Sequence, residues 1–280
     1  MRTLKRRILV MLLAAMIAFC AYATKPNVSR ADGDTLLLHS DSNFSITVTD
    51  YDFDELFGLQ LSLQIKNTSG KALLFSASLG TINSLMVEPF LYGTVEAGKT
   101  MEEKLRYSSK GTQYSGCNVI KECTFYLTVS DPKNPQEPLF FDWLGVEFTD
   151  NSGEPAIVPF EFTCNEVELI NTSDFYVSFL DAYEAASGLD MVLYIKNRTK
   201  NAVRVELSNI SINGVASTPF FVHEILPGYS LCDAASWFDS FLTENKITSI
   251  KEIGFTIEIY LYDDYGTTPL LSKECGVVFS

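Results

Sequence analysis

Apolar and polar residues alternate with a period of two in many short stretches of this chain. Two such stretches cover residues 59–66 and 189–196. Their apolar positions are Leu59, Leu61, Leu63 and Ile65 in the first stretch, and Leu189, Met191, Leu193 and Ile195 in the second. A period of two is that of a β-strand with one buried face, and such strands are typical of antiparallel sheets. The pattern therefore predicts an all-β protein.

The same reasoning extends to the rest of residues 41–150. Strands are expected near residues 43–50, 57–67, 72–79, 86–94, 100–107, 120–130 and 139–149. Seven short strands in about this length predict a β-sandwich of the immunoglobulin type.

The chain carries an internal repeat at an offset of about 130 residues. Matching segments are Ile65-Lys66-Asn67 and Ile195-Lys196-Asn197, Ile82-Asn83 and Ile212-Asn213, Pro89-Phe90 and Pro219-Phe220, Gly98 and Gly228, and Ile120-Lys121-Glu122 and Ile250-Lys251-Glu252. We interpret this as a duplication that gives two tandem immunoglobulin-like β-sandwich domains, at 41–150 and 166–280. Residues 151–165 are expected to form a linker, and its apolar part, 157–162, is expected to pack as an extra strand or against the interdomain face.

The two copies differ between their fifth and sixth strands. In the second copy Ser236 can cap a helix, and Trp237, Phe238, Phe241 and Leu242 would form its apolar face. This pattern predicts a short helix across one end of the sandwich. The corresponding residues 108–113 are polar and contain glycine, so a loop or a less stable turn of helix is expected there.

The N-terminus has the features of a signal peptide. A basic cluster at residues 2–7 precedes the apolar run 8–18, and Ala21-Tyr22-Ala23 is typical of a cleavage site. We expect cleavage after Ala23, followed by a flexible tether over 24–40. Two alternatives stay open. Lipidation at Cys20 is disfavoured by the bulky Phe19, and a retained membrane anchor is disfavoured because the run is shorter than the ~20 residues that span a bilayer.

The negative charge of the chain disfavours some classes of binding partner. The sequence has 21 basic and 35 acidic residues, and removal of residues 1–23 would take away four basic residues and leave a formal charge of about −18. Nucleic acid and anionic membranes are therefore poor partners, and no stable membrane insertion is expected after cleavage. The protein is expected to be secreted or associated with the cell surface.

Five cysteines would remain after cleavage, at 117, 123, 164, 232 and 275. Cys117, Cys123 and Cys275 align with Ile247, Ile253 and Leu144, so they are interpreted as small buried hydrophobes. A local Cys117–Cys123 disulfide is the alternative in an oxidising compartment. A Cys/His metal site is disfavoured because the chain lacks a Cys-x-x-Cys motif and has two histidines.

Two possible catalytic motifs are not repeated in the second copy, which argues against a functional site at either. Residues 93–100 match a phosphate-binding loop, but the second copy has Tyr229 in place of Lys99, and Glu96 would oppose a phosphate. We therefore expect a turn between two strands at 97–99. For a nucleophile paired with histidine, His39 lies in the expected tether and His223 aligns with Gly93, so neither belongs to a shared site.

Paired carboxylates are a further candidate chemistry. Asp50, Asp52, Asp54 and Glu55 could converge on one side of an extended segment and bind Ca²⁺. A solvated acidic turn is the favoured interpretation, and a glycosidase-like acid pair is a further alternative. No cofactor is expected other than this weak calcium site.

Tyrosines are the best candidate ligand-binding residues. Tyr194 and Tyr260 occupy the polar phase of their strands, Tyr262 follows Tyr260 in the same phase, and Tyr265 lies in a turn. Such rings can stack on sugars or anchor a protein partner if they gather on one face, and otherwise they simply suit a half-exposed sheet.

The recurring order of these motifs resembles a known group of domains. A strand ending in Ile-Lys-Asn is followed by Ile-Asn-Ser or Ile-Asn-Gly, then Ala-Gly-Lys or Pro-Gly-Tyr, then Ile-Lys-Glu-x-x-Phe and a closing Gly-Val-x-Phe. This is similar to the poorly characterised Ig-like repeat domains of proteins exported by Gram-positive anaerobic bacteria, over residues 41–150 and 166–280. The resemblance implies a secreted or surface-associated, non-enzymatic protein and supplies no catalytic residues.

The expected function is therefore that of a non-enzymatic binding or spacer protein whose partner is an extracellular protein or glycan. A carbohydrate- or cell-wall-binding module that uses the exposed tyrosines is the first alternative. An acid-only enzyme acting on glycans is the second alternative, and it would require carboxylates that face each other across a groove.

Overall fold

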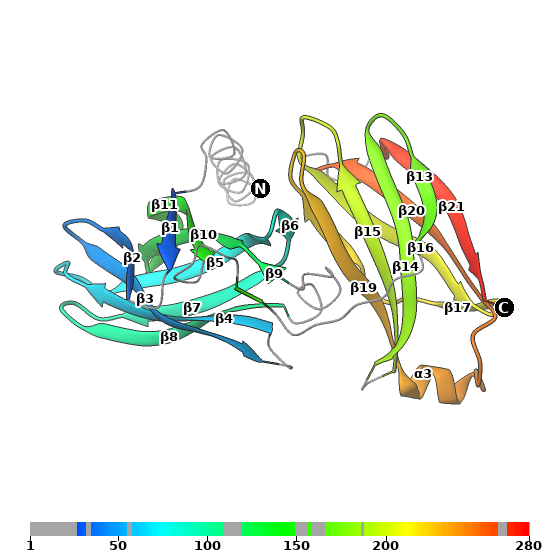
Figure 1. The fold of residues 1–280 in the computed structure, drawn as a ribbon, viewed down its shortest axis with the longest axis horizontal. Helices are drawn as coiled ribbons and strands as arrows, with labels where there is room; N and C mark the ends of the chain where they lie inside the picture. Colours follow the sequence, from blue (N-terminus) through cyan, green and yellow to red (C-terminus); the bar gives the residue numbers. More distant parts are fainter. Residues whose placement is uncertain are drawn as a thin grey trace, which may run out of the picture. The chain divides into compact units, whose positions relative to one another are not determined.

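The computed structural model describes residues 27–31, 35–54, 58–108, 119–148, 156–157, 166–185, 188–262 and 268–279. The chain divides into two compact units, residues 1–161 and 162–280. Each unit is built almost entirely of strands, as Figure 1 shows, so the all-β prediction is confirmed.

Unit 1 contains two facing sheets. Its strands are β1 (Asn27–Ala31), β2 (Leu36–Ser40), β3 (Phe44–Asp54), β4 (Gly58–Asn67), β5 (Leu73–Ile82), β6 (Leu85–Met86), β7 (Pro89–Val95), β8 (Thr100–Tyr107), β9 (Val119–Ile120), β10 (Glu122–Asp131), β11 (Asn134–Phe148) and β12 (Ala156–Ile157). One sheet has the order β2-β3-β4-β8, and the other has the order β7-β5-β10-β11. Strand β1 adds to the second sheet by pairing in parallel with β11.

The core of unit 1 lies between these sheets. It is formed by the inward residues of alternating strands, such as Ile46 on β3, Leu61 on β4, Phe75 on β5 and Phe125 on β10, which are all fully buried. Strand β7 belongs to both sheets, because Pro89 and Phe90 pair with β8 while residues 91–95 pair with β5. The order β3-β4-β8 facing β5-β10-β11, with β7 at the edge, is that of an immunoglobulin-like sandwich.

Unit 2 has two sheets as well. Its elements are β13 (Val167–Asn171), β14 (Phe175–Ala185), β15 (Gly188–Asn197), β16 (Val203–Ile212), β17 (Val215–Ser217), β18 (Val222–Ile225), β19 (Ser230–Phe238), α3 (Asp239–Glu244), β20 (Glu252–Leu261) and β21 (Leu271–Val278). The sheets have the orders β13-β14-β15-β19 and β18-β16-β20-β21. Strands β4 and β15, β5 and β16, and β10 and β20 each begin 130 residues apart.

The expected tether over residues 24–40 is wrong in its second half. Residues 36–40 form β2, which pairs with β3 and places the buried Leu38 in the core. The prediction failed because a strand of five residues with one bulge, between Leu37 and His39, is too short to show a period. The first sandwich therefore starts before residue 41. Residues 27–31 also form a strand, β1.

The expected helix exists, but it begins later than predicted. Ser236 and Trp237 belong to β19, where Trp237 is buried and pairs with Leu189. The Trp237 ring N–H donates to the Ser217 hydroxyl at 2.8 Å, so the indole is satisfied inside the sandwich rather than on a helix. Helix α3 therefore starts at Asp239 without a side-chain cap, and no residue of it is buried.

Two expectations about connecting segments have partial outcomes. In the expected linker, Ala156 and Ile157 form β12, which pairs with β9, and residues 151–155 and 158–165 lie outside the described residues. The loop expected at residues 108–113 also lies outside them, apart from Ser108.

Candidate functional site

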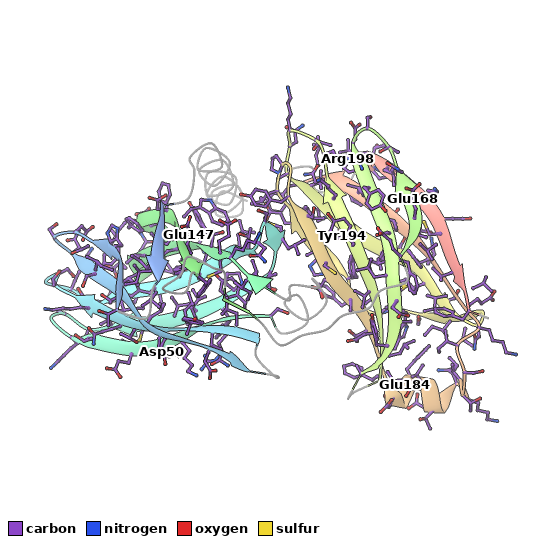
Figure 2. All side chains as sticks on the ribbon, viewed as in Figure 1. Asp50, Glu147, Glu168, Glu184, Tyr194 and Arg198 are labelled. Atoms are coloured by element: carbon purple, nitrogen blue, oxygen red, sulfur yellow. The ribbon has the colours of Figure 1, made fainter. Side chains whose placement is uncertain are left out.

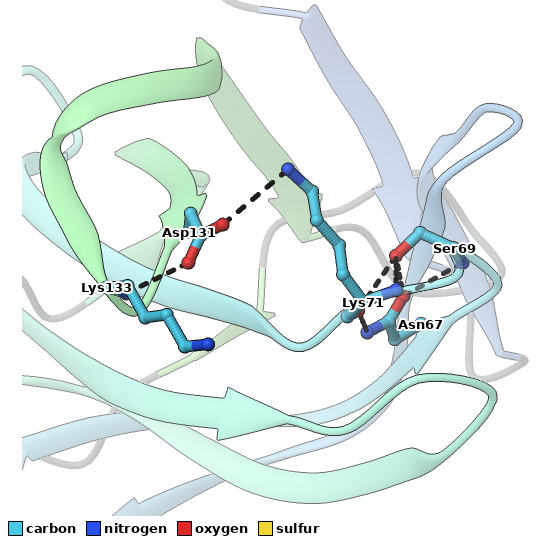
Figure 3. A network of polar contacts seen from close by, with 5 residues as sticks. All are labelled: Asn67, Ser69, Lys71, Asp131 and Lys133. Atoms are coloured by element: carbon cyan, nitrogen blue, oxygen red, sulfur yellow. Dashed lines mark hydrogen bonds and ion pairs between the residues drawn. The ribbon is translucent and has the colours of Figure 1, made fainter.

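A buried asparagine fastens the same loop in each unit. In unit 1 the side-chain amide of Asn67 donates to the carbonyl oxygens of Lys71 and Val95, both at 2.8 Å. Its oxygen accepts from the backbone N–H and the hydroxyl of Ser69, at 2.9 and 2.7 Å. Figure 3 shows the contacts of Asn67 with Ser69 and Lys71 and, beside them, the exposed Lys71–Asp131 ion pair of 3.8 Å. This ion pair contributes at most about 1 kcal/mol.

Asn197 makes the equivalent contacts in unit 2. Its amide donates to the carbonyl oxygens of Asn201 and Ile225 at 2.8 and 3.0 Å. Its oxygen accepts from the backbone and the hydroxyl of Thr199. Both asparagines are fully buried. The asparagine of the repeated Ile-Lys-Asn motif therefore links β4 or β15 by hydrogen bonds to the adjoining loop and to the end of β7 or β18.

A second repeated asparagine joins two turns. Asn83 has a φ of +50° and Asn213 one of +52°, a left-handed conformation that asparagine tolerates better than most residues. The side-chain oxygen of Asn83 accepts from the backbone N–H groups of Lys121 and Glu122, at 2.7 and 3.3 Å. Asn213 accepts from Lys251 and Glu252 at 2.8 and 3.1 Å. The repeated Ile-Lys-Glu text supplies these donors.

The segment that resembles a phosphate-binding loop is a turn, as predicted. Residues 96–99 connect β7 to β8, with the Lys99 N–H donating to the Glu96 carbonyl at 3.0 Å. Gly98 has a φ of +67° and its counterpart Gly228 one of +79°, so glycine serves the left-handed position of the turn in both units.

The acidic residues of β3 take part in a bulge. The register of β3 and β4 shifts between Val48 and Asp50, which leaves Thr49 unpaired. The Asp50 carboxylate accepts from the Tyr51 backbone N–H at 2.8 Å. In unit 2 the register shifts between Phe179 and Asp181, and Asp181 accepts from the Ala182 N–H at 2.7 Å.

This bulge gives Asp50 a structural partner that the predicted calcium site did not include. Asp52 is exposed further along β3, and the side chains of Asp54 and Glu55 lie outside the described residues. Within the part of the chain whose side chains are described, no group of three or more His, Cys, Asp or Glu residues is arranged to hold a metal ion.

The histidines lie against aromatic rings and a carboxylate. His39 is on β2, not in a tether, and stacks on Phe44 with 4.6 Å between ring centroids. Its Nε2 is 3.4 Å from an oxygen of Asp41. His223 on β18 lies 3.6 Å from an oxygen of Asp233 and touches the ring of Phe221. The two histidines therefore occupy different positions in the two units, as the sequence alignment indicated.

The described cysteines behave as apolar residues. Cys123 and Cys232 are buried free thiols and Cys275 is half-buried. Burial raises the pKa of the Cys123 thiol to about 12, although contacts with Tyr107 and the Val146 backbone oppose this shift, so it is a poor nucleophile at neutral pH. Cys117, its proposed disulfide partner, lies outside the described residues, as does Cys164.

The predicted tyrosines are not brought together. Tyr194 is on β15, whereas Tyr260 is on β20 in the opposite sheet of unit 2. Because each occupies the outward phase of its strand, the two rings point away from each other. Tyr262 directly follows β20, and its backbone N–H donates to the Ala202 carbonyl at 3.1 Å. Tyr265 lies outside the described residues.

Tyr194 belongs to an aromatic cluster on the outer face of its sheet. Tyr176 on β14 is its edge-to-face neighbour, with 6.1 Å between centroids. The guanidinium of Arg198 lies 5.5 Å from the Tyr176 ring centroid, and Figure 2 labels Tyr194 and Arg198 on this sheet. Tyr176 donates to Glu166 at 2.6 Å. This bond raises the pKa of Tyr176 and lowers that of Glu166.

Tyr260 lies in a charged environment. Strand pairing places Glu224, Arg204 and Tyr260 in one row across β18, β16 and β20. The Arg204 guanidinium lies 4.9 Å from the Tyr260 centroid and forms an ion pair with Glu206. Partial burial, followed by the carboxylates of Glu258 and Glu206, raises the pKa of Tyr260. The ring is therefore already covered by a partner from its own sheet.

One row on the matching outer face of unit 1 is aromatic and uncharged. Here Tyr92, Ser76, Thr128 and Phe141 form one row across β7, β5, β10 and β11. In the next row Tyr126 contacts Trp143 with 5.7 Å between centroids. Burial, followed by the nearby carboxylate of Asp142, raises the pKa of Tyr126 to about 12.

Sequence reasoning missed one exposed phenylalanine in each unit. Phe90 is 64% exposed and its counterpart Phe220 is 83% exposed. The repeat revealed that both positions carry phenylalanine after proline, but an apolar residue beside a strand is normally assigned to the core. Exposure is the signal that separates them, and it requires the structure.

These features define an all-β protein of immunoglobulin-like sandwich architecture with aromatic residues on its outer faces. In the described residues there is no helix long and apolar enough to cross a membrane.

Comparison with known proteins gives no family assignment. No family model and no curated protein matches the chain. Solved structures that match include the YadV chaperone, with 13% identity, 85% of this chain and 100% of that chain covered, and a TM-score of 0.28. The Salmonella enterica SafA pilin in complex with the SafB chaperone matches with 9% identity, coverage of 90% and 100%, and a TM-score of 0.25.

A protein of unknown function from Porphyromonas gingivalis W83 matches with 13% identity, coverage of 89% and 98%, and a TM-score of 0.24. Similarity this low does not indicate a shared function.

Proposed function

We propose that this chain is an exported, non-enzymatic binding or spacer protein made of two tandem Ig-like sandwiches that arose by duplication. Export through the N-terminal leader, by secretion or to the cell surface, and kinship with the Ig-like repeats of Gram-positive anaerobes are parts of this proposal. The observation that supports it is that two sets of residues have different roles. Repeated polar residues hold turns together, whereas aromatic residues stand on the outer faces.

The duplication is supported by contacts as well as by sequence. Asn67 and Asn197 make the same set of hydrogen bonds, and Asn83 and Asn213 make another. All four asparagines bond to backbone groups, whose positions depend on the fold rather than on a ligand. Structural roles of this kind account for the repeated residues without a shared catalytic group.

A pull-down with purified protein tests the binding function. The protein would be presented to cell-wall polysaccharide, host glycans and extracellular protein extracts, with and without calcium. Saturable and competable retention is expected. Retention that requires calcium would support a calcium site that includes Asp50 and Asp52. No retention on any of these materials would contradict the binding function and favour the spacer function.

Carbohydrate binding through tyrosine is a second candidate, supported by the Tyr176–Tyr194 pair. Two rings lie side by side on the outer face of one sheet, with the Tyr194 hydroxyl 2.8 Å from the Ser230 hydroxyl and Arg198 next to Tyr176. Rings and hydroxyl groups together suit a sugar.

The positions of the tyrosines supply a matched control for this candidate. Tyr194→Ala should abolish retention on a glycan array, whereas Tyr260→Ala, on the opposite sheet, should leave it unchanged. Equal effects of both substitutions, or of neither, would contradict a glycan site at Tyr194.

A further inference from the structure

The outer row of unit 1 from Tyr92 to Phe141 has an aromatic ring at each end and two hydroxyl groups between them. Strand pairing places Tyr92 beside Ser76, Ser76 beside Thr128, and Thr128 beside Phe141. Tyr92 is 65% exposed and Phe141 is 38% exposed. Folding gains little from the parts of these rings that stay in water. Two such rings on one row therefore point to a role outside the sandwich.

The ring of Phe141 is held in place by two further aromatic residues. The ring centroid of Tyr126 lies 6.4 Å from that of Phe141, and Tyr126 packs edge-to-face on Trp143 at 5.7 Å. Both Tyr126 and Trp143 are buried. The aromatic end of the row on β11 is thus a packed cluster with one ring accessible to a ligand.

The two hydroxyl groups between the rings are not used by the fold. Ser76 and Thr128 are half-buried, and no described residue forms a hydrogen bond with either side chain. A hydroxyl can donate one hydrogen bond and accept two. Both groups are therefore available to a ligand that also meets the rings.

Few charged residues lie on the strands that carry this row. Strands β5 and β7 have none, and β10 has charged residues at its two ends alone, Glu122 and Asp131. On β11, Asp142 follows Phe141, but its carboxylate accepts from the Trp143 backbone N–H at 2.8 Å. The whole chain, in contrast, has 35 acidic and 21 basic residues. A neutral row on such a protein favours an uncharged ligand.

The distance between the two rings indicates an elongated ligand. Neighbouring strands lie about 4.8 Å apart, so the three steps from β7 to β11 separate Tyr92 from Phe141 by about 14 Å. A ligand that meets both rings needs apolar surface at its two ends and hydrogen-bonding groups between them. A neutral oligosaccharide fits, because the C–H face of a sugar complements the negative face of an aromatic ring, and sugar hydroxyls line its edges.

Two observations disfavour a protein partner at this row. The exposed parts of the two rings together offer about 150–250 Å² of apolar surface, whereas a stable protein interface needs roughly 800 Å² from each partner. In addition, β5 and β10 are paired with strands on both sides. Their backbone groups are therefore not free to bind an added strand, and a ligand meets the face of the sheet.

We propose that the outer face of unit 1 binds a neutral oligosaccharide along the row Tyr92, Ser76, Thr128 and Phe141. This inference rests on the proposed binding function and specifies its ligand. The two rings stack on sugars at either end of the bound segment, and the two hydroxyls bond to the sugar hydroxyls between them. The site is separate from the Tyr176–Tyr194 pair, which belongs to unit 2.

A glycan array tests the proposal with the full-length protein. The array carries neutral oligosaccharides of glucose, mannose, xylose and galactose, from one to six units long, and oligogalacturonates of the same lengths as charged counterparts. We expect retention on at least one neutral series, rising with length until the ligand reaches both rings, and none on the oligogalacturonates. Tyr92→Ala should weaken binding of the longest retained oligosaccharide about tenfold, the loss of one stacked ring.

Matched variants separate the ring from the hydroxyls. Tyr92→Phe should bind as the wild type does, because the stacking ring is kept. Phe238→Ala is the control for removal of an exposed ring, since Phe238 is 70% exposed but lies on β19 in unit 2, and it should leave binding unchanged. The double variant Ser76→Ala/Thr128→Val should weaken binding severalfold.

Fluorescence gives a second measurement that does not depend on the array. In the variant Trp237→Phe, Trp143 is the remaining tryptophan, and it belongs to the cluster that holds Phe141. Titration with the longest retained oligosaccharide should change its emission. The same titration of Tyr92→Ala in this background should need about tenfold more ligand. A far-ultraviolet circular dichroism melt of each variant shows whether it is folded.

Several outcomes would overturn the proposal. These are equal retention of neutral oligosaccharides by wild type and folded Tyr92→Ala, equal losses in Tyr92→Ala and Phe238→Ala, or stronger retention on oligogalacturonates than on every neutral series. A loss on Tyr194→Ala but not on Tyr92→Ala would assign glycan binding to unit 2. Protein retention in the pull-down without any retention on the array would remove this site and leave the general binding function standing. No retention in either experiment would contradict both.

Discussion

The two units share their turns but differ on the outer face of equivalent sheets. In unit 1 the row from β7 to β11 reads Tyr92, Ser76, Thr128 and Phe141. In unit 2 the corresponding row from β18 to β21 reads Val222, Glu206, Glu258 and Ser272. The row in unit 1 is uncharged and has two aromatic residues, whereas the row in unit 2 has two carboxylates. The turns that depend on backbone hydrogen bonds are therefore alike in the two units, whereas these outer rows differ in charge.

The protein provides a separate fluorescence signal for each unit. Its two tryptophans are Trp143 on β11 in unit 1 and Trp237 on β19 in unit 2, and both are buried. In a background where one of them is replaced by phenylalanine, the remaining tryptophan reports the unfolding of its own unit in urea. The predictions below use this signal to compare the units.

The largest expected effect comes from the glycines that begin β4 and β15. Gly188 has a φ of +144°, and a Cβ atom there would lie 1.9 Å from the Trp237 carbonyl oxygen. Gly188→Ala should lower the unfolding free energy of unit 2 by about 3 kcal/mol or more. Gly58, with a φ of +67°, should cost only about 1–2 kcal/mol when changed to alanine. Equal losses in the two units would contradict the close approach at Trp237.

The buried asparagines should be equally important in both units. Asn67→Ala and Asn197→Ala each remove a side chain that satisfies several buried backbone groups. Each change should lower the unfolding free energy of its own unit by about 2–3 kcal/mol. Thr68→Ala, which removes an exposed hydrogen bond to Ser42, is the control and should cost less than about 1 kcal/mol. A large effect in one unit only would show that the two fastenings are not equivalent.

The asparagines with positive φ should have a smaller effect. Replacement of Asn83 or Asn213 by glycine keeps the left-handed backbone accessible but removes the hydrogen bonds from the backbone N–H groups at the start of β10 or β20. We expect a loss of about 1 kcal/mol in each unit. The measurement is again the urea midpoint of the matching tryptophan. Alanine at the same positions should cost more than glycine, because it adds the strain of a positive φ.

A bulge shared by β5 and β16 provides a test that should stabilise the protein. Leu79 has a φ of +49° and its counterpart Asn209 one of +51°. Asparagine is more tolerant of this conformation than leucine, so Leu79→Asn should stabilise unit 1 by about 0.5–1 kcal/mol. Asn209→Leu should destabilise unit 2 by a similar amount. A loss of stability on Leu79→Asn would show that packing of the leucine outweighs its backbone strain.

The smallest expected effect concerns acid stability. Partial burial alone would raise the pKa of Asp41, but hydrogen bonds from the N–H groups of Phe44 and Asn43 and the contact with His39 lower it below its usual value. A carboxylate whose pKa is lower in the folded state stabilises that state above about pH 4, and this contribution is lost as pH falls through the folded pKa.

Thr172 makes the same turn in unit 2 without a titrating group, since its hydroxyl accepts from Asp174 and Phe175. Unit 1 should therefore lose more stability than unit 2 from this turn between pH 5 and pH 2. Asp41→Thr should remove that difference, as measured by urea midpoints across this pH range. An unchanged pH profile in Asp41→Thr would show that other carboxylates dominate.

The strands that the sequence predicts are those with long, regular alternation. Strands β4 and β15 were predictable because Leu59 to Ile65 and Leu189 to Ile195 keep one phase throughout. The bulge at Thr49 breaks the phase in β3, so the side chains of Asp50 and Asp52 could not be placed from spacing alone. Strand β2 was missed because its five residues contain another bulge.

The candidate site was less predictable than the fold. The outward phase of Tyr194 and Tyr260 follows from alternation, but which sheet each strand joins depends on pairing between distant segments. Phe90 is more difficult still, since its residue type suggests burial and its exposure depends on where β7 crosses from β8 to β5. The internal repeat shows that this position carries phenylalanine in both copies, but it does not show whether the side chain is exposed.

The parallel pairing of β1 with β11 has a consequence for mechanical load. Five residue pairs, from Asn27–Leu144 to Ala31–Phe148, join the beginning of unit 1 to its end. When a parallel pair is pulled apart from opposite ends, its hydrogen bonds are sheared together instead of breaking one at a time. Tension applied to unit 1 through the N-terminal end of β1 and the C-terminal end of β11 would therefore load this pair in shear.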